Sequence, residues 1–533
     1  MIQKRYFGAM LDCSRNAVMK PEEIVNFAGI LKSFGYNMIQ LYTEDTYEVE
    51  DEPFFGYMRG RYTQKQLSYI VDECEELGVE VIPCIQTLAH LNQIMRWEPY
   101  AKINDTADIL LAGEERTYEL VENMFKTLRK CFKTEYVHIG MDEAEMIGRG
   151  TYFNKHGVRN HLDILKEHLG KVCSIAKKYG FKPIMWSDMF FKLATDGKTY
   201  YHRNPNVTEE VKNAVPSEVG LVYWDYYHKD ETMYDSMFSA HKKFKNEVWF
   251  AGGAWTWTGF ASGNDFTMET MIPAMRSAKE HGVENIFFTM WGDNGKECSF
   301  YSVLPSLFAL KKIYDGETDM QKIKSEFQTI TGENFDALSS CDIPNYVSGN
   351  RSCKINVAKY SLYGDPFNAW LECKVKDGVR EEYTEHAKTL YAYAAESKNY
   401  GYLFESLGAL CDVLSVKYGL GIRTREAYVQ KDVKALKAII QEYELTQSKL
   451  EVFYRKFRAL WYKENNPTGF DVQDLRLGGL KQRMSSCKER LEAYLAGEIK
   501  NIPELEEEML DCWPQEEIVG CSLWLRNVTM NIV

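Results

Sequence analysis

The chain has 533 residues, of which 45% are hydrophobic and 26% charged, and a formal net charge of -13 at pH 7. A soluble protein of this length is too large for one ordinary core, so two or three domains are expected. The acidic balance argues against nucleic acid or an anionic membrane as the main partner. The sequence contains no run of roughly 18 apolar residues that would predict a membrane-spanning helix.

The 13 cysteines are scattered and never form a CxxC motif. This pattern predicts neither a zinc site nor a disulfide scaffold, and no metal or cofactor is expected. The N-terminus begins with a strand pattern rather than with the apolar run of a signal peptide. These features together favour a reduced, cytoplasmic protein, because a secreted enzyme more often has a signal peptide and few free thiols.

Short apolar runs alternate with amphipathic helical patterns over the first 316 residues. The runs are short and rich in β-branched or aromatic residues, as buried strands are. They cover residues 5–12, 36–45, 79–87, 136–143, 181–189, 219–227, 247–255 and 285–295. Several of the intervening helical patterns open with Pro or Thr and close on Gly, which are expected start and stop signals.

Eight strands alternating with helices predict an α/β fold, a parallel (β/α)8 TIM barrel over residues 1–316. A doubly wound sheet would give the same alternation, so the choice depends on the count of eight and on the absence of GxGxxG before the first helix. Residues 317–533 show mainly the helical period, which predicts an α-helical C-terminal domain. The Pro- and Gly-containing segment 465–480 is interpreted either as a helix connection or as a loop that reaches the barrel.

Active sites of such barrels lie at the carboxyl ends of the strands, so the residues that end or follow each run are candidate site residues. These are Arg15, Glu44 with Asp45, His90, Asp142 with Glu143, Trp186 with Asp188, Tyr223 with Asp225, Trp255, and Trp291 with Asp293. One tryptophan after a strand is more often part of the core, but here every strand end offers a polar or aromatic group. Aromatic rings among Asp, Arg and His suit a sugar, whose apolar face stacks on Trp and whose hydroxyls bind charged groups.

Asp142 and Glu143 are adjacent at the end of the fourth run. Taken alone, the pair fits a helix N-terminus, where acidic side chains offset the positive end of the helix dipole. Glycosidases with two carboxylates acting on one bond hold them about 5 to 9 Å apart, which adjacent residues seldom span. The pair therefore indicates one proton donor and one partner that orients another group.

The motif HIGMDE at residues 138–143 resembles the H-x-G-G-D-E signature of glycoside hydrolase family 20, the β-N-acetylhexosaminidases. Further segments resemble that family in the right order along the barrel. They are Asp12 to Arg15 (D-x-x-R), RGRYT at 59–63, PCIQTLAH at 83–90, YWD at 223–225 and WGD at 291–293. The ordered set is more specific than the hexapeptide alone.

The resemblance implies an exo-β-N-acetylhexosaminidase that removes terminal β-linked GlcNAc or GalNAc from glycans. In the retaining, substrate-assisted mechanism of this family, the acetamido oxygen of the sugar attacks the anomeric carbon and forms an oxazolinium ion. Glu143 would be the general acid/base, with a raised pKa. Asp142 would orient the acetamido group by accepting its N–H.

The same resemblance implies nine substrate-site residues. Tyr223 would bind the acetamido oxygen, and Trp186, Trp255 and Trp291 would form the walls around the sugar. Arg15, Asp225 and Asp293 would bind the outer hydroxyls of the sugar. His90 and Asp45 would support Glu143. Glu44 is the alternative to Asp45 for that last position.

Two residues depart from the family pattern: Met141 replaces the second glycine, and Asp293 replaces a glutamate. The family's usual small α/β domain is not expected, because the first strand pattern begins within about five residues of Met1.

Three alternatives stay open: a disaccharide-releasing enzyme of the lacto-N-biosidase type, a catalytically inactive sugar-binding barrel, and a non-sugar barrel enzyme with a carboxylate dyad. The natural glycan, the linkage and the oligomeric state, a homodimer included, are also open.

Overall fold

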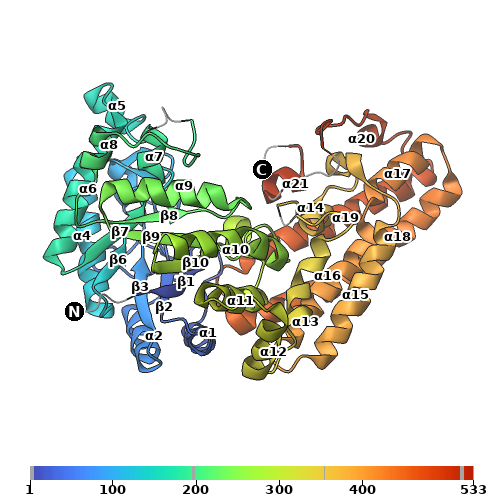
Figure 1. Cartoon of the computed structure of the whole chain (residues 1–533). Coiled ribbons are helices and arrows are strands. Elements are labelled where there is room, and N and C mark those ends of the chain that lie inside the picture. The colour runs from blue at the N-terminus through green and yellow to red at the C-terminus, as the bar shows by residue number, and fades with distance from the viewer. Residues whose placement is uncertain (1–4, 195–197, 353, 517–520, 522, 532–533) are drawn as a thin grey trace.

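The structure, a computed structural model, describes residues 5–194, 198–352, 354–516, 521 and 523–531. Eight parallel strands close into a barrel in the order β1-β10-β9-β8-β7-β6-β3-β2 (Figure 1). They are β1 Phe7–Asp12, β2 Met38–Tyr42, β3 Glu80–Cys84, β6 Tyr136–His138, β7 Lys182–Trp186, β8 Gly220–Trp224, β9 Val248–Gly253 and β10 Asn285–Met290. Each lies within one of the eight predicted runs, so the predicted TIM barrel is confirmed. A small antiparallel pair, β4 Asn104–Thr106 and β5 Ile109–Leu110, lies in the connection after β3.

Side chains on alternate positions of the strands fill the inside of the barrel. On β8, Val222 points inward, whereas Leu221 and Tyr223 belong to the core between the sheet and the helices. Both faces of each strand are therefore buried, which explains why the strands are continuously apolar in the sequence. The alternation also decides which residue at each strand end reaches the pocket.

Helices on the outside of the barrel follow the strands and connect each to the next, except α11, which follows the last strand. The longer ones are α1 Pro21–Ser33, α2 Gln64–Glu76, α4 Glu115–Cys131, α6 His161–Lys178, α9 Glu231–His241, α10 Asn264–Glu280 and α11 Leu304–Asp315, and the shorter ones are α3 Asn92–Met95, α5 Thr151–His156, α7 Asp188–Ala194 and α8 Glu209–Ala214. The expected start signals are present: Pro21 begins α1, and Thr63 with Gln66 forms a capping box on α2.

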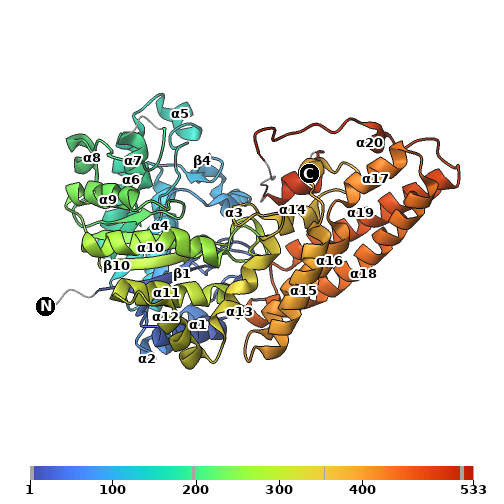
Figure 2. The same ribbon diagram turned by 45° about the vertical axis from the view of Figure 1, so that its right-hand side comes forward.

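The chain after α11 is helical, as predicted, and lies on one side of the barrel (Figures 1 and 2). Its helices are α12 Met320–Thr331, α13 Phe335–Ser339, α14 Val357–Tyr363, α15 Val379–Glu396, α16 Gly401–Lys417, α17 Leu420–Val429, α18 Val433–Glu464, α19 Asp471–Leu495, α20 Pro503–Glu506 and α21 Trp524–Val528. The division at residue 316 falls in the turn between α11 and α12.

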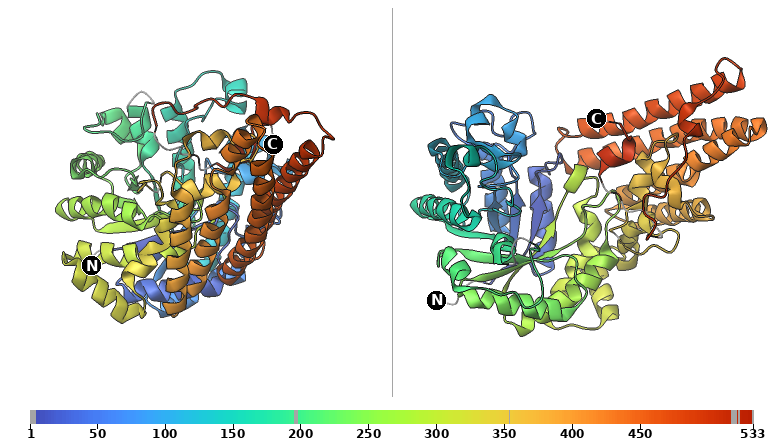
Figure 3. Two further views of the ribbon diagram at one scale, coloured as in Figure 1. Left: turned by 90° about the vertical axis from the view of Figure 1, so that its right-hand side faces the viewer. Right: turned by 90° about the horizontal axis from the view of Figure 1, so that it is seen from above.

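The C-terminal region packs directly against the barrel (Figure 3). Phe260, in the loop after β9, contacts the rings of Tyr363, Phe453 and Phe457, with ring centroids 5.3 to 6.0 Å apart. The segment that joins α18 to α19 also reaches the barrel, since the Asn466 N–H donates to the Val18 carbonyl at 2.7 Å. Both interpretations therefore hold for residues 465–470, which connect two helices and touch the loop after β1, whereas residues 471–480 are part of α19.

Within the part of the chain that the structure describes, no helix has the length and apolar character needed to cross a membrane. The described cysteines are all free thiols.

Phe260 tests how much the contact between the two regions contributes to stability. We expect Phe260→Ala to lower the free energy of unfolding by about 3 to 5 kcal/mol, because it leaves a cavity at a buried aromatic cluster. Urea denaturation followed by circular dichroism measures this change. Phe153→Ala is the control, since Phe153 is 47% exposed, and it should change stability by less than about 0.5 kcal/mol. Equal effects of the two substitutions would contradict the expectation.

Candidate active site

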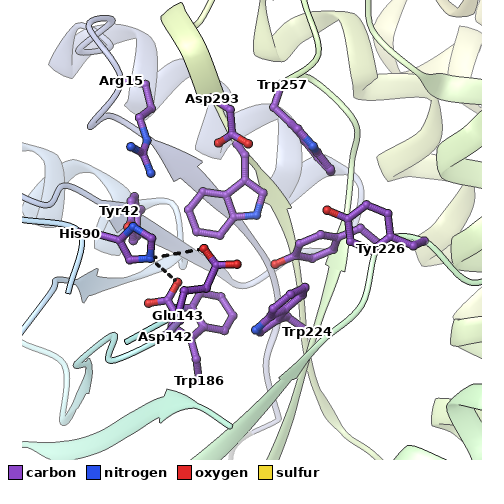
Figure 4. A pocket seen from close by; sticks show the side chains of 12 residues that line it. Arg15, Tyr42, His90, Asp142, Glu143, Trp186, Trp224, Tyr226, Trp257 and Asp293 are labelled. Atoms are coloured by element: carbon purple, nitrogen blue, oxygen red, sulfur yellow. Dashed lines mark ion pairs between the residues drawn. The ribbon is translucent and has the colours of Figure 1, made fainter. Parts of the chain in front are cut away.

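A pocket opens at the carboxyl ends of the barrel strands (Figure 4). Its lining residues are Arg15, Tyr42, His90, Asp142, Glu143, Trp186, Trp224, Tyr226, Tyr227, Trp257, Trp291 and Asp293. The structure thus brings together seven of the residues singled out in the sequence: Arg15, His90, Asp142, Glu143, Trp186, Trp291 and Asp293. Six others, Glu44, Asp45, Asp188, Tyr223, Asp225 and Trp255, do not line it.

The backbone after β6 explains how two adjacent carboxylates reach one pocket. The strand ends at His138, and Gly140, Met141 and Glu143 then adopt positive φ angles of 70°, 70° and 51°. This irregular backbone breaks the alternation that would send neighbouring side chains to opposite faces. At Gly140 the left-handed backbone also leaves no room for a side chain, because a Cβ there would lie 2.1 Å from Gln86 Oε1.

Asp142 is bound through both of its carboxylate oxygens. Gln86 Nε2 donates to Oδ1 at 2.7 Å, and His90 Nε2 lies 3.2 Å from Oδ2. The same Gln86 accepts the Met141 N–H at 3.1 Å, so one buried side chain fixes both the turn and the carboxylate. His90 Nε2 also lies 3.8 Å from Glu143 Oε2 and therefore bridges the two acidic groups (Figure 4).

The two carboxyl groups have different electrostatic environments. Burial alone would lower the pKa of His90, but the Asp142 carboxylate raises that pKa to about 10. Burial opposes the ionisation of Asp142, yet the charge of His90 and the hydrogen bond from Gln86 lower its pKa. Desolvation, and then the charge of Asp142, raise the pKa of Glu143. Asp142 is therefore the ionised member of the pair, and Glu143 is the member suited to carry a proton.

The two acidic residues after β2 point in different directions. Glu44 Oε1 lies 3.1 Å from Arg15 Nη2 and accepts the Tyr42 hydroxyl at 2.9 Å. Burial raises the pKa of Glu44 to about 7, against the effect of Arg15. Asp45 instead accepts Arg59 Nε at 3.3 Å. Of the two alternatives, Glu44 contacts the residues that line the pocket.

Tyr223 and Asp225 lie behind the pocket wall. Tyr223 is fully buried against Phe238 of α9, and its hydroxyl donates to Asp225 at 2.7 Å. Asp225 also accepts the Tyr227 N–H at 3.0 Å and lies 2.7 Å from His228 Nδ1. The carboxylate thus fixes the turn after β8, which carries Tyr226 into the pocket.

Trp255 likewise supports a neighbour that lines the pocket. Its ring stacks on Trp257 with centroids 4.1 Å apart, and its Nε1 donates to the Tyr226 carbonyl at 3.1 Å.

Sequence reasoning did not select Tyr42, Trp224, Tyr226, Tyr227, Trp257 or the buried Gln86. The alternation along β8 contains the signal for one of them, because an inward Val222 places Trp224 inward and Tyr223 outward.

Residues 5–251 match the Glycosyl hydrolase family 20 catalytic domain, and residues 333–523 match the Glycoside Hydrolase 20C C-terminal domain. The chain belongs to glycoside hydrolase family 20. The resemblance first drawn from HIGMDE is thereby confirmed. Trp291 and Asp293 lie in the loop after β10, outside the matched residues of the catalytic domain.

This family 20 enzyme is similar to curated hexosaminidases, with which it shares a low sequence identity. It is 21% identical to Hexosaminidase D of Bos taurus over 262 residues, 47% of this chain and 70% of that protein. It is 24% identical to the Beta-hexosaminidase subunit beta of Entamoeba histolytica over 244 residues, 39% of this chain and 42% of that protein. The alignment thus spans less than half of the Entamoeba relative.

Solved family 20 structures are also similar. The beta-N-acetylhexosaminidase from Bacteroides fragilis is 18% identical with a TM-score of 0.47, covering 61% of this chain and 69% of that one. The Flavobacterium johnsoniae chitobiase is 15% identical with a TM-score of 0.48, and the match covers 94% of this chain and 74% of the chitobiase chain.

Among the described side chains, no group of three or more His, Cys, Asp or Glu residues could hold a metal ion.

The charge state of His90 tests the electrostatics of this family 20 site. We expect His90 to titrate at a pKa of about 10, and to titrate near or below the ordinary value of about 6.5 in Asp142→Asn, because burial is then opposed by fewer negative charges. NMR of histidine-labelled protein measures this, with His90→Asn assigning the signal. His138 is the internal control, since burial lowers its pKa to about 3. A wild-type His90 that titrates near 6.5 would contradict the Asp142 pairing.

Proposed function

We propose that this family 20 enzyme is an exo-β-N-acetylhexosaminidase that releases terminal β-linked GlcNAc or GalNAc by retaining, substrate-assisted hydrolysis. The observation that carries the proposal is the difference between two adjacent carboxyl groups. His90 and Gln86 favour the ionised form of Asp142, whereas desolvation and the charge of Asp142 favour the neutral form of Glu143. The curated relatives are named as hexosaminidases, which supports the same activity.

The first chemical step breaks the glycosidic bond. Glu143 donates its proton to the leaving oxygen while the substrate's acetamido oxygen attacks the anomeric carbon, forming the oxazolinium ion. Asp142 accepts the acetamido N–H and so aligns the nucleophile and offsets the positive charge on the forming ring. The raised pKa of Glu143 suits it to carry the proton that this step requires.

The second step returns the enzyme to its starting state. The Glu143 carboxylate accepts a proton from water as the water oxygen attacks the anomeric carbon. The carbon–oxygen bond of the oxazolinium breaks, the acetamido group is restored, and the sugar leaves with its β configuration retained. Both carboxyl groups act on the same sugar but on different atoms, so they need not lie on opposite sides of one bond.

The aromatic walls supply the sugar-binding surface. Trp224, Tyr226 and Trp257 lie across the pocket from His90 and Arg15, with Glu143 between the two sides (Figure 4). We assign the acetamido oxygen to the hydroxyl of Tyr226, because Tyr226 lines the pocket and Tyr223 is buried behind it. Arg15 and Asp293 are assigned to the outer hydroxyls, and the aromatic rings to the apolar sugar face.

A panel of 4-nitrophenyl glycosides tests the proposed activity. We expect cleavage of the N-acetyl-β-glucosaminide or the N-acetyl-β-galactosaminide and no cleavage of the plain β-glucoside, which lacks the internal nucleophile. Release of nitrophenol measures both. Robust hydrolysis of the plain glucoside would exclude the assisted mechanism. Cleavage of the lacto-N-bioside alone would indicate a disaccharide-releasing enzyme, and no cleavage at all would indicate a sugar-binding barrel.

Glu143→Gln tests the role of the general acid. We expect kcat/KM to fall by about 10²- to 10⁴-fold for substrates with poor leaving groups, and much less for activated dinitrophenyl substrates that leave without a proton. Steady-state kinetics on a leaving-group series measures the dependence. Glu114→Gln is the matched control, because Glu114 pairs with Lys155 at 2.7 Å and does not line the pocket. A loss that is independent of the leaving group would contradict the assignment.

A further inference from the structure

The loop after β10 has a strained backbone directly beside the pocket. Asp293 lines the pocket, and the next three residues, Asn294, Gly295 and Lys296, have φ angles of 48°, 126° and 52°. Two of these three residues are not glycine, so the conformation is unfavourable for the loop by itself. Such a backbone persists only where the surrounding structure fixes it.

Side chains of the C-terminal region fix this loop. Arg476 of α19 donates from Nη1 to the Asn294 carbonyl at 2.8 Å and from Nη2 to Asn294 Oδ1 at 3.2 Å. Lys359 of α14 donates to the same carbonyl at 3.2 Å. Gln473 Nε2 donates to the Gly295 carbonyl at 3.2 Å. Three side chains from two helices therefore bind the strained backbone.

Glu297 connects these cations to the end of the loop. Its carboxylate lies 2.6 Å from Lys359 Nζ and 3.0 Å from Arg476 Nη1. The side chains of Glu297 and Lys359 are only 1% exposed, and that of Arg476 is 9% exposed. Because burying charges is costly, a buried ion cluster is weak support for stability, and a role in fixing geometry is the better explanation here.

The fit between the loop and Arg476 leaves no spare space. A Cβ added to Gly295 would lie 2.4 Å from Arg476 Nη1. The C-terminal region also touches the loop that carries Arg15, since Asn466 binds Val18 and the Lys20 N–H donates to the Glu464 carbonyl at 3.0 Å. Both loops assigned to the outer hydroxyls of the sugar are thus in contact with the C-terminal region.

We propose that Arg476 and Lys359 are positioning residues of the active site, through which the C-terminal region sets the place of Asp293 and hence the recognition of the outer sugar hydroxyls. Neither side chain lines the pocket, so both act through the loop. The inference rests on the proposed function for the identity of the sugar. It gives the C-terminal region a direct part in substrate specificity.

Arg476→Met is the test variant. We expect kcat/KM for the preferred N-acetylhexosaminide to fall by about 10- to 100-fold, mainly through KM, because a small displacement of a positioning group is costly. Arg483→Met is the matched control on the same helix, since Arg483 Nε pairs with Asp365 Oδ2 of the C-terminal region at 2.5 Å. The control should change the melting temperature and leave kcat/KM unchanged when both variants are assayed while folded.

Deoxy substrates separate positioning from general destabilisation. In the wild type, removing the 4- or 6-hydroxyl of the sugar should reduce kcat/KM, and this penalty should shrink in Arg476→Met because Asp293 is no longer held in place. Arg476→Lys, which keeps the charge beside Glu297, should restore part of the penalty. Gly295→Ala should reproduce the effect from the barrel side, and its combination with Arg476→Met should be non-additive.

The outcomes distinguish this inference from the proposed function. If the wild type cleaves N-acetylhexosaminides and Arg476→Met keeps the wild-type KM and deoxy penalty, the inference is overturned and the function stands. If the wild type cleaves none of them, titration calorimetry with GlcNAc replaces kinetics. Weaker GlcNAc binding by Arg476→Met than by Arg483→Met then supports the positioning role, and equal binding overturns it.

Discussion

The candidate site depends on one constraint, the left-handed backbone that follows β6. A strand continued through Asp142 and Glu143 would place one carboxyl in the pocket and the other among the outer helices. Positive φ angles at Gly140, Met141 and Glu143 bring both to the pocket. Gln86 then locks this turn by accepting the Met141 N–H and donating to Asp142. The unequal pKa values of the two carboxyls follow from that placement.

Met141 shows why a departure from the family glycine is tolerated. A left-handed residue with a side chain costs roughly 1 to 2 kcal/mol. Full burial of a methionine side chain contributes roughly 1.5 to 3 kcal/mol, and Met141 is fully buried in the core between barrel and helices. The two terms are of similar size, so the turn keeps its shape without the glycine.

The barrel was predictable because eight apolar runs are buried on both faces and contrast with the polar helices between them. The common edge of parallel strands likewise made it predictable that His90, Asp142 and Trp291 would meet. The facing of the aromatic residues around β8 was not predicted, because it depends on the register within the strand and on the backbone of the loop that follows. Tyr223 belongs to the outward face of β8, and Tyr226 reaches the pocket only through a turn that the sequence motif does not describe. The contacts of the C-terminal region with the loop after β10 join residues far apart in the chain, which no local pattern encodes.

The central claim is that Asp142 serves the substrate's own acetamido group while Glu143 serves the leaving group. A crystal structure with a thiazoline analogue of the oxazolinium ion tests this most directly. The account predicts that the ring nitrogen lies within hydrogen-bonding distance of Asp142 and that the Glu143 carboxyl faces the anomeric carbon on the side of the departing group. An analogue bound with its nitrogen away from Asp142, or with Glu143 contacting the thiazoline ring in place of Asp142, would contradict it.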